Sequence, residues 1–415
     1  RTVLLMKETL EKVEGGICAP LGFKSAAISC GIKNPAVERL DLALIYSEFP
    51  TVGSAVYTQN HVCAAPVRLS ASYLKSAEPR AVIVNSGNAN ACTGHQGMVN
   101  AKAMANATSK ALGLRQREVQ VCSTGIIGVQ MPIERIEPRI PELVGKLDYD
   151  SDPAARAIMT SDTCPKSIAI SVKIGDKMVR IGAIAKGAGM INPQMATMLC
   201  FITTDAAISK AEITAATREA VDLSFNRISV DGDMSTNDTV VVMANHQAGN
   251  KTITRGGEGS AEFREALNEV MLCLAKRIVA DGERVTKLVE VRVHGAASNL
   301  DAERVARAVA NSNLVKCSWN GNDPNWGRIL HAVGYSGARV KEEMVNIHLN
   351  GVIATQNGLN AGTDIEKLAV AVSGPEFTVC IDLNIGKGDF NMYTSDLSPE
   401  YVIFNQSEYS VVKKK

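Results

Sequence analysis

Short apolar runs alternate with longer amphipathic segments along the chain. Four runs combine β-branched residues with a length suited to strands: 81–85 (AVIVN), 119–123 (VQVCS), 240–245 (VVVMAN) and 288–295 (LVEVRVHG). Between residues 260 and 280, five apolar residues recur at three- or four-residue spacing, namely Phe263, Leu267, Val270, Leu274 and Ile278. This spacing predicts one long amphipathic helix, which ends at the ADG triplet. Strands interleaved with helices predict an α/β (α+β) fold.

The chain length predicts more than one domain. At 415 residues, the chain exceeds what one simple core organises, so we expect two or three domains. A strand-rich region opens after the long helix. We therefore expect a core domain over residues 1–283 and a smaller α/β domain over residues 284–415.

The balance of charges argues against two classes of partner. Lysine and arginine number 44 against 43 acidic residues, and the formal net charge is +1. Neither the basic stripe of a nucleic-acid-binding protein nor a polybasic membrane patch is present. No apolar stretch approaches the roughly 20 residues of a membrane span, and the first thirty residues lack signal-peptide order. We expect a cytoplasmic protein, or one of an organelle matrix if a targeting segment has been removed.

The sequence gives no sign of a bound metal or cofactor. The ten cysteines contain no C-x-x-C pair, so we expect reduced and mostly buried thiols. The six histidines form no zinc motif. The GAGMIN turn lacks the third glycine of a dinucleotide fingerprint, and no P-loop occurs.

The stretch 186–206, KGAGMINPQMATMLCFITTDA, places glycines and a proline before an apolar run of strand character. An internal threonine hydroxyl is a poor nucleophile without a base, and no histidine lies near Thr197 in the sequence. A threonine at a chain start carries its own base, because an α-amine has a pKa of about 7.7–8.0. The segment therefore suggests a cut between Ala196 and Thr197 that would make Thr197 a nucleophile.

Two further segments are dense in small polar residues at expected strand ends. NSGNANACTG (85–94) follows the first run, and STGIIG (123–128) follows the second. One interpretation is a pair of tight turns. The other is that backbone N–H groups and the Thr124 hydroxyl converge on a developing oxyanion.

Several long motifs occur together and in order: GGICAPLGFKSAA, SGNANACTG, STGIIG, SDTCPK, KGAGMINPQMATML, RISVDGDMSTNDT, DGERVTK, DPNWGRI and YVIFN. In these motifs the chain resembles the ornithine acetyltransferase family, the bifunctional glutamate N-acetyltransferases of arginine biosynthesis. The resemblance implies a layered αββα core like that of the aminopeptidase-esterase relatives. It also implies self-cleavage before Thr197 into an α chain (1–196) and a β chain (197–415), assembled as a heterotetramer of two α and two β chains.

The resemblance also assigns roles to individual residues. Thr197 would attack the acetyl carbonyl with its own α-amine as general base, and Thr124 and Gly125 would form the oxyanion hole. The substrate-binding residues would be Thr163, Lys186, Thr197, Glu283, Asn405 and Ser410. Ornithine ends in an ammonium and glutamate in a carboxylate. A pocket that accepts both substrates therefore needs a carboxylate such as Glu283 and an ammonium such as Lys186. Taken alone, Glu283 is better explained as a solvated carboxylate at a helix end, and the resemblance reverses that order.

The implied reaction is ping-pong acetyl transfer from N2-acetyl-L-ornithine to L-glutamate, without a metal or prosthetic group. Whether acetyl-CoA serves as a further acetyl donor stays open. One alternative is an autoprocessed N-terminal-threonine amidohydrolase or aminopeptidase, which passes the acyl group to water. Another is an amino-acid-binding protein without turnover.

The chain departs from the family pattern at three places. Gln194 stands where asparagine is usual, and Arg284-Val285 stand where small residues are usual. The arginine adds a cation next to Glu283. Tyr409 is displaced by one position, which leaves Ser410 as the hydroxyl five residues after Asn405.

Overall fold

The computed structural model describes residues 10–192 and 198–406, and these form two units. Unit 1 comprises residues 1–226 and 233–278, and unit 2 comprises residues 227–232 and 279–415. From the sequence we expected the division between residues 283 and 284, whereas the units divide after Ile278. The segment 227–232 also belongs to unit 2, where Ile228 forms a β-bridge with Tyr393. This long-range pairing has no local sequence signal.

Unit 1 contains a six-stranded sheet in which the strand after residue 197 is central. In sheet order its strands are β1 (Leu10–Lys12), β7 (Lys166–Ile174), β8 (Lys177–Lys186), β9 (Leu199–Thr204), β10 (Thr239–Ala244) and β4 (Val52–Tyr57). β9 and β10 run parallel, with Thr239 opposite Leu199, and the other neighbours are antiparallel. Every residue of β9 and β10 is buried, as expected of strands covered on both faces.

A second, four-stranded sheet packs against the first. Its strands, in order, are β2 (Phe23–Ile28), β3 (Leu42–Ser47), β5 (Ala81–Asn85) and β6 (Val119–Ser123). Residues from both sheets share one core, including Phe23, Val84, Phe201 and Val241. The inner faces of the two sheets therefore form one apolar layer.

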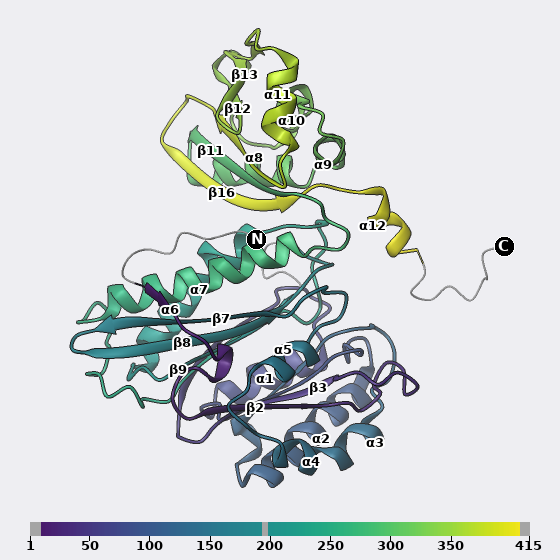
Figure 1. Cartoon of the computed structure of the whole chain (residues 1–415), viewed down its shortest axis with the longest axis vertical. Helices are drawn as coiled ribbons and strands as arrows, with labels where there is room; N and C mark the ends of the chain where they lie inside the picture. Colours follow the sequence, from purple (N-terminus) through teal and green to yellow (C-terminus); the bar gives the residue numbers. More distant parts are fainter. Residues whose placement is uncertain (1–9, 193–197, 407–415) are drawn as a thin grey trace, which may run out of the picture. The chain divides into compact units, whose positions relative to one another are not determined.

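Helices cover the outer faces of both sheets (Figure 1). Those on the four-stranded sheet are α1 (Ala65–Leu74), α2 (Gly94–Leu112), α3 (Ile133–Ile136) and α4 (Ile140–Gly145), whereas α5 (Asp152–Ala157) contributes Ala154, Ala155 and Ala157 to the core between the two sheets. α2 and α4 pack on the four-stranded sheet through Met104 and Leu143. α6 (Lys210–Leu223) and α7 (Ser260–Ala280) lie on the far side of the six-stranded sheet. The order helix, sheet, sheet, helix confirms the predicted αββα core.

Unit 2 is a smaller α/β unit, as predicted. Its sheet has the order β14 (Leu359–Asn360), β13 (Val352–Gln356), β12 (Asn346–Leu349), β15 (Glu376–Asp382), β11 (Leu288–Ala296) and β16 (Gly388–Ser395). The helices are α8 (Asn299–Ala310), α9 (Asn313–Asn320), α10 (Trp326–Tyr335), α11 (Ile365–Ser373) and α12 (Pro399–Phe404). Trp319 packs edge-on against Phe377 in its core, with ring centroids 5.9 Å apart.

The elements predicted from apolar periodicity are present. The runs 81–85 and 119–123 are β5 and β6, and the helix at 260–280 is α7. The run at 240–245 is β10, which begins one residue earlier, and the run at 288–295 is β11. All five predicted apolar positions of α7 are buried.

The cysteines are unpaired, as expected, but fewer of them are buried than the sequence predicts. Five are buried, whereas Cys92, Cys164 and Cys317 are exposed. Burial raises the pKa of Cys18 to about 11 and that of Cys30 to about 12. In the described ranges, no cluster of His, Cys, Asp or Glu has the arrangement of a metal site. None of the described helices has the length and apolar character needed to cross a bilayer.

Candidate active site

Four strand ends meet on one side of unit 1. β8 ends at Lys186, which pairs with Leu199 at the start of β9, and Leu199 pairs in turn with Thr239 at the start of β10. The amide of Asn237, just before β10, donates to the Ser123 carbonyl at 2.9 Å and so ties in the end of β6. Met198, the residue bonded to Thr197, therefore lies among these strand ends.

The turn after β6 leaves two hydrogen-bond donors available. The Thr124 N–H donates to the Asn85 carbonyl at 3.0 Å, so only the hydroxyl of Thr124 remains for a ligand. The Gly125 N–H has no hydrogen-bond partner within the described residues. Gly125 has φ +132°, and a Cβ there would lie 2.3 Å from the Gly87 carbonyl carbon. Only glycine fits this close backbone approach, which gives the N–H its direction.

Buried asparagines hold this turn in place. Asn85 accepts from the Ser123 hydroxyl at 2.6 Å and donates to the Asn88 carbonyl at 2.8 Å. Asn88 in turn accepts from the Asn90 N–H at 2.8 Å and donates to the Val129 carbonyl at 3.1 Å. The NSGNAN segment is thus a set of tight turns, and these turns orient Thr124 and Gly125. The side chains of these asparagines already have hydrogen-bond partners within the turns. The Gly125 N–H has none in the described structure and is therefore available to a ligand.

Lys186 places a cation next to the Thr124 hydroxyl. Its Nζ donates to the Thr160 hydroxyl at 2.6 Å and lies 3.4 Å from that of Thr124, and the side chain is only 3% exposed. Asp162 faces this ammonium at 3.9 Å and accepts from Lys166 Nζ and from the Gly187 N–H, both at 2.7 Å. Burial alone would raise the pKa of Asp162, but the Lys186 and Lys166 ammonium groups hold it well below its usual range. The buried Lys186 is therefore charge-compensated.

The resemblance implied that Thr163 binds substrate, and another nearby hydroxyl contacts the Lys186 Nζ. Thr163 lies in an exposed part of the chain after Asp162, whereas Thr160 makes the 2.6 Å contact with Lys186. Thr160 and Asp162 were missed as site residues. The sequence did offer one signal, because Asp162 belongs to the SDTCPK motif.

Asp238 is a further residue that sequence reasoning missed. Its Oδ1 accepts the Met198 N–H at 2.9 Å, and its own carbonyl accepts the Thr58 N–H at 2.9 Å. Burial raises the pKa of the Asp238 carboxyl well above its usual range. An acid two residues before the apolar run 240–244 was the signal in the sequence.

In unit 2, Glu283 and Asn405 lie together, as the resemblance implied. The Asn405 amide donates to Glu283 Oε2 at 2.9 Å and to the Tyr401 carbonyl at 3.1 Å. The guanidinium of Arg284 stacks on Phe404 of α12, 4.7 Å from the ring centroid. The unusual arginine therefore packs on α12. Ala196, Thr197, Gln194, Tyr409 and Ser410 lie outside the described residues.

Comparison with known proteins identifies the family. The model of the ArgJ family matches residues 24–410. The chain belongs to the ArgJ family. An ArgJ of Geobacter sulfurreducens, named an arginine biosynthesis bifunctional protein, is 51% identical over 386 residues, which cover 92% of this chain and 98% of the relative. The Bacillus subtilis protein of the same name is 41% identical over 98% of this chain and 99% of its own length.

Solved ArgJ-family structures give partial superpositions. A crystal structure of ArgJ from Bacillus halodurans matches with TM-score 0.48 and 39% identity, over 49% of this chain and 97% of that chain. The Mycobacterium tuberculosis ornithine acetyltransferase, solved with ornithine, matches with TM-score 0.41 and 38% identity, over 45% and 99%. Membership of the ArgJ family confirms the predicted resemblance and makes this chain an acyltransferase of arginine biosynthesis.

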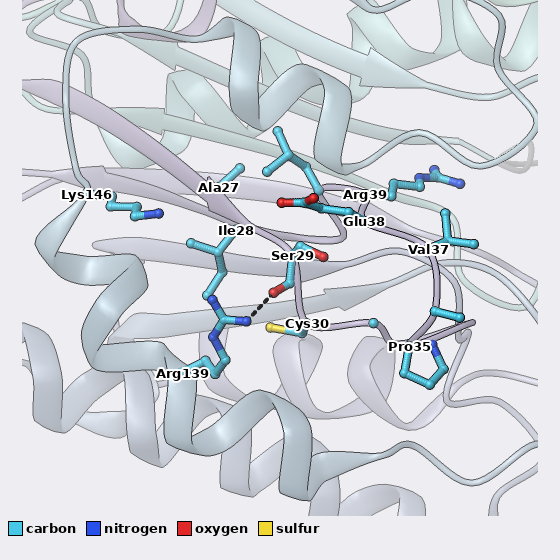
Figure 2. Close-up of a pocket in the computed structure, with 13 residues that line it drawn as sticks. Ala27, Ile28, Ser29, Cys30, Pro35, Val37, Glu38, Arg39, Arg139 and Lys146 are labelled. Carbon is cyan, nitrogen blue, oxygen red and sulfur yellow. Dashed lines mark hydrogen bonds between the residues drawn. The ribbon is translucent and has the colours of Figure 1, made fainter.

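The structure also has a surface cavity of about 650 Å³ (Figure 2). It is lined by the end of β2 and the following loop, with Arg139 donating to the Ser29 carbonyl at 2.6 Å. Both Arg139 and Lys146 pair with Glu142, at 2.8 and 3.2 Å. None of the predicted site residues lines this cavity.

Proposed function

We propose that the chain transfers an acetyl group from N2-acetyl-L-ornithine to L-glutamate through an acetyl-Thr197 intermediate, after cleavage between Ala196 and Thr197. The observation that carries this proposal is the grouping of the unpartnered Gly125 N–H, the Thr124 hydroxyl and the Lys186 ammonium at the strand ends where Met198 lies. These are donors of the kind that stabilise an oxyanion in acyl transfer.

The first half-reaction would begin with the free α-amine of Thr197. The amine takes the hydroxyl proton while Oγ attacks the acetyl carbonyl carbon, and the carbonyl oxygen becomes an oxyanion. The Gly125 N–H and the Thr124 hydroxyl would donate to this oxygen, and the nearby Lys186 cation would lower the energy of the negative charge. The tetrahedral centre then collapses, the C–N bond to ornithine breaks, and the ornithine nitrogen takes the proton from the α-ammonium.

The second half-reaction would run the same chemistry in reverse. The glutamate amine attacks the acetyl-threonine ester, its proton passes to the Thr197 α-amine, and the alkoxide leaves as the restored hydroxyl. No metal or prosthetic group takes part in this scheme. Acetyl-CoA would serve as a second donor if it acetylates the same threonine.

We also propose the substrate-binding roles that the resemblance implied. The carboxylate of Glu283, oriented by Asn405 at 2.9 Å, would attract the distal ammonium of ornithine. Lys186 would interact with the acyl group or with the glutamate carboxylate, and Thr163 and Ser410 would add hydroxyl contacts. The processed chains would assemble as two α and two β chains in the cytoplasm or an organelle matrix.

A single-substrate labelling experiment tests this function. Purified enzyme given N2-acetyl-L-ornithine without glutamate should gain one acetyl mass on the fragment that begins with Thr197, as read by denaturing mass spectrometry. Addition of glutamate should remove the acetyl group and yield N-acetylglutamate. The Thr197→Ala variant is the control and should neither cleave nor acquire the label.

Two outcomes would contradict the proposal. An active enzyme that consists only of intact chain would exclude the N-terminal threonine mechanism. Release of acetate with no acetylglutamate in the presence of glutamate would instead favour the amidohydrolase alternative.

A further inference from the structure

A second surface cavity of unit 1, of about 770 Å³, is lined by residues of α1, α2 and the segment 115–117 that precedes β6. On α1, Arg68 and Ser72 are one turn apart, and on α2 the same spacing separates Met98 and Lys102. Each helix therefore presents one face to the cavity. The volume is in the range of pockets that bind small molecules, about 300–1,000 Å³.

The described lining of this cavity carries four cations and no carboxylate. The cations are Arg68, Lys102, Arg115 and Arg117. The chain as a whole is balanced, with 44 basic and 43 acidic residues, yet α1 and α2 contain no aspartate or glutamate. Arg115 is paired with Glu118 outside the lining, at 3.2 Å. The other three cations make the cavity attractive to an anion.

Two of these three cations are available to a ligand. Arg117 donates to the Ser76 hydroxyl at 3.1 Å, which holds its guanidinium in place. The exposed side chains of Arg68 and Lys102 make no hydrogen bond or ion pair within the described residues, and the Ser72 hydroxyl has no partner there either. The cavity therefore offers one anchored cation, two cations without a counterion and a hydroxyl.

The kind of anion follows from the donors and from the apolar part of the lining. A guanidinium binds phosphate oxygens through two parallel N–H donors, and Arg68 and Arg117 supply two such groups. Leu69, Tyr73 and Met98 add apolar surface. Burial raises the pKa of Tyr73, so its phenol stays neutral near pH 7. Inorganic phosphate would leave this apolar surface uncovered, whereas an organic phosphate covers it.

The cavity and the candidate active site lie at opposite ends of β6. Arg117 stands two residues before β6 begins at Val119, and Thr124 follows the last residue of the strand, Ser123. A five-residue strand spans about 16 Å. None of the candidate active-site residues lines the cavity. A ligand bound in it therefore leaves the strand ends around Met198 accessible.

We propose that this cavity binds a phosphorylated organic molecule of nucleotide size. The phosphate oxygens accept hydrogen bonds from Arg68, Lys102, Arg117 and the Ser72 hydroxyl, and the organic part covers the apolar surface next to Tyr73. This inference goes beyond the proposed acetyl transfer and does not depend on it, because the two sites share no residue.

The test is isothermal titration calorimetry of the whole chain with ADP as the probe. We expect one saturable site per chain, with an affinity that falls as salt is added. Arg68→Glu and Lys102→Glu should each weaken ADP binding at least roughly tenfold, because each replaces a cation with a charge that repels phosphate. Arg68→Gln and Lys102→Gln are the second variants if a charge reversal impairs folding, and they should also weaken binding.

Lys110→Glu is the matched control. Lys110 is also an exposed lysine of α2, but it does not line the cavity. It lies eight residues beyond Lys102, about 12 Å along the helix, which exceeds the screening length of about 10 Å at 0.1 M salt. Its reversal should change the ADP affinity by less than about twofold. An equal loss of affinity in Lys110→Glu and Lys102→Glu would overturn the assignment to this cavity.

Two further ligands identify the group that is recognised. Adenosine, which has no phosphate, should not bind, and pyrophosphate should bind at least roughly tenfold more weakly than ADP because it covers no apolar surface. Equal affinities for pyrophosphate and ADP would overturn the assignment of an organic ligand. Absence of ADP binding, or binding that Arg68→Glu and Lys102→Glu leave unchanged, would overturn the site itself.

Competition separates this inference from the proposed function. N2-acetyl-L-ornithine should not displace ADP, and displacement would place ADP in the candidate active site and overturn the inference. A failure of the acetyl-labelling experiment would defeat the proposed acetyl transfer, whereas ADP binding with the expected response of the Arg68 and Lys102 variants would still establish the second site.

Discussion

Asp162 and Lys166 form an ion pair that is sealed from solvent, with Nζ 2.7 Å from Oδ1 and side chains 0% and 1% exposed. The same carboxylate faces Lys186 and accepts the Gly187 N–H. One acid therefore compensates two buried lysines and fixes the backbone at the end of β8. Stability and catalysis are expected to depend on it together.

Replacing Asp162 by Asn should remove the carboxylate that pairs with the buried Lys166 and faces the buried Lys186. Breaking a buried pair in this way typically costs about 3–5 kcal/mol. Urea denaturation followed by circular dichroism measures the loss. Asp152→Asn is the control, because its pair with Arg156 is 55% exposed on both sides, and it should change stability by less than about 1 kcal/mol. Equal losses in the two variants would contradict the assignment.

Replacing Gly125 by Ala should abolish most activity. A Cβ would lie 2.3 Å from the Gly87 carbonyl carbon and 2.5 Å from the Asn88 nitrogen, so the turn must move and redirect the N–H. Gly128→Ala is a matched control, because Gly128 also has a positive φ, +82°, but a Cβ there meets nothing within 4 Å. Initial rates should fall far more for Gly125→Ala, and comparable rates for the two variants would argue against a role for the Gly125 N–H.

Replacing Thr124 by Ala should slow turnover more than it weakens substrate binding. An oxyanion donor acts chiefly in the transition state, and removal of one typically costs about 2.7–4 kcal/mol in kcat. Thr124→Ser keeps the hydroxyl beside Lys186 and should retain most of the rate. A raised KM with unchanged kcat would instead assign the hydroxyl to ground-state binding.

The stability of unit 2 should rise with pH because of Lys316. Burial lowers the pKa of this lysine to about 7, from 10.5. Between these values the unfolded chain binds a proton that the folded chain does not, so unfolding becomes harder as pH increases from about 7 to 10. Below pH 7 both states are protonated and the cost of burying the charge is fully present.

Urea midpoints of wild type and Lys316→Met at pH 7, 8.5 and 10 check this prediction. The urea midpoint of the wild type should rise with pH relative to that of Lys316→Met. It should not rise relative to that of the control Lys367→Met, because Lys367 is exposed. Parallel curves for wild type and Lys316→Met would show that Lys316 stays charged in the folded protein.

The sequence predicted elements better than contacts. β5, β6 and α7 were predicted at their observed bounds, because an apolar run bounded by turn residues is a local signal. The Asp238 to Met198 bond joins residues 40 positions apart, and the Asp162 to Lys186 contact joins residues on either side of the β7–β8 hairpin. Neither follows from spacing, because each depends on which strands become neighbours. The segment 227–232 joined unit 2 for the same reason.

The sequence pointed to candidate site residues that lie in family motifs, and it did not point to those that depend on burial. Thr124, Gly125, Lys186 and the Glu283–Asn405 pair came from family motifs. Thr160, Asp162 and Asp238 act by supporting other groups, and a polar residue gains such a role only when packing removes water from it. Their importance became visible from burial and hydrogen-bond partners.

The strand order of the six-stranded sheet implies that the residues before and after position 197 must fold together. β9 and β10 lie between β8 and β4, so residues after 197 supply the middle of a sheet whose flanks come from residues before it. Either half alone would present open strand edges and bare apolar faces, which favour aggregation. In the uncut chain, covalent linkage supplies both halves in equal amounts while the sheet forms. Once the sheet has formed, a break before Thr197 would leave the hydrogen bonds on both sides of β9 to hold the two fragments together.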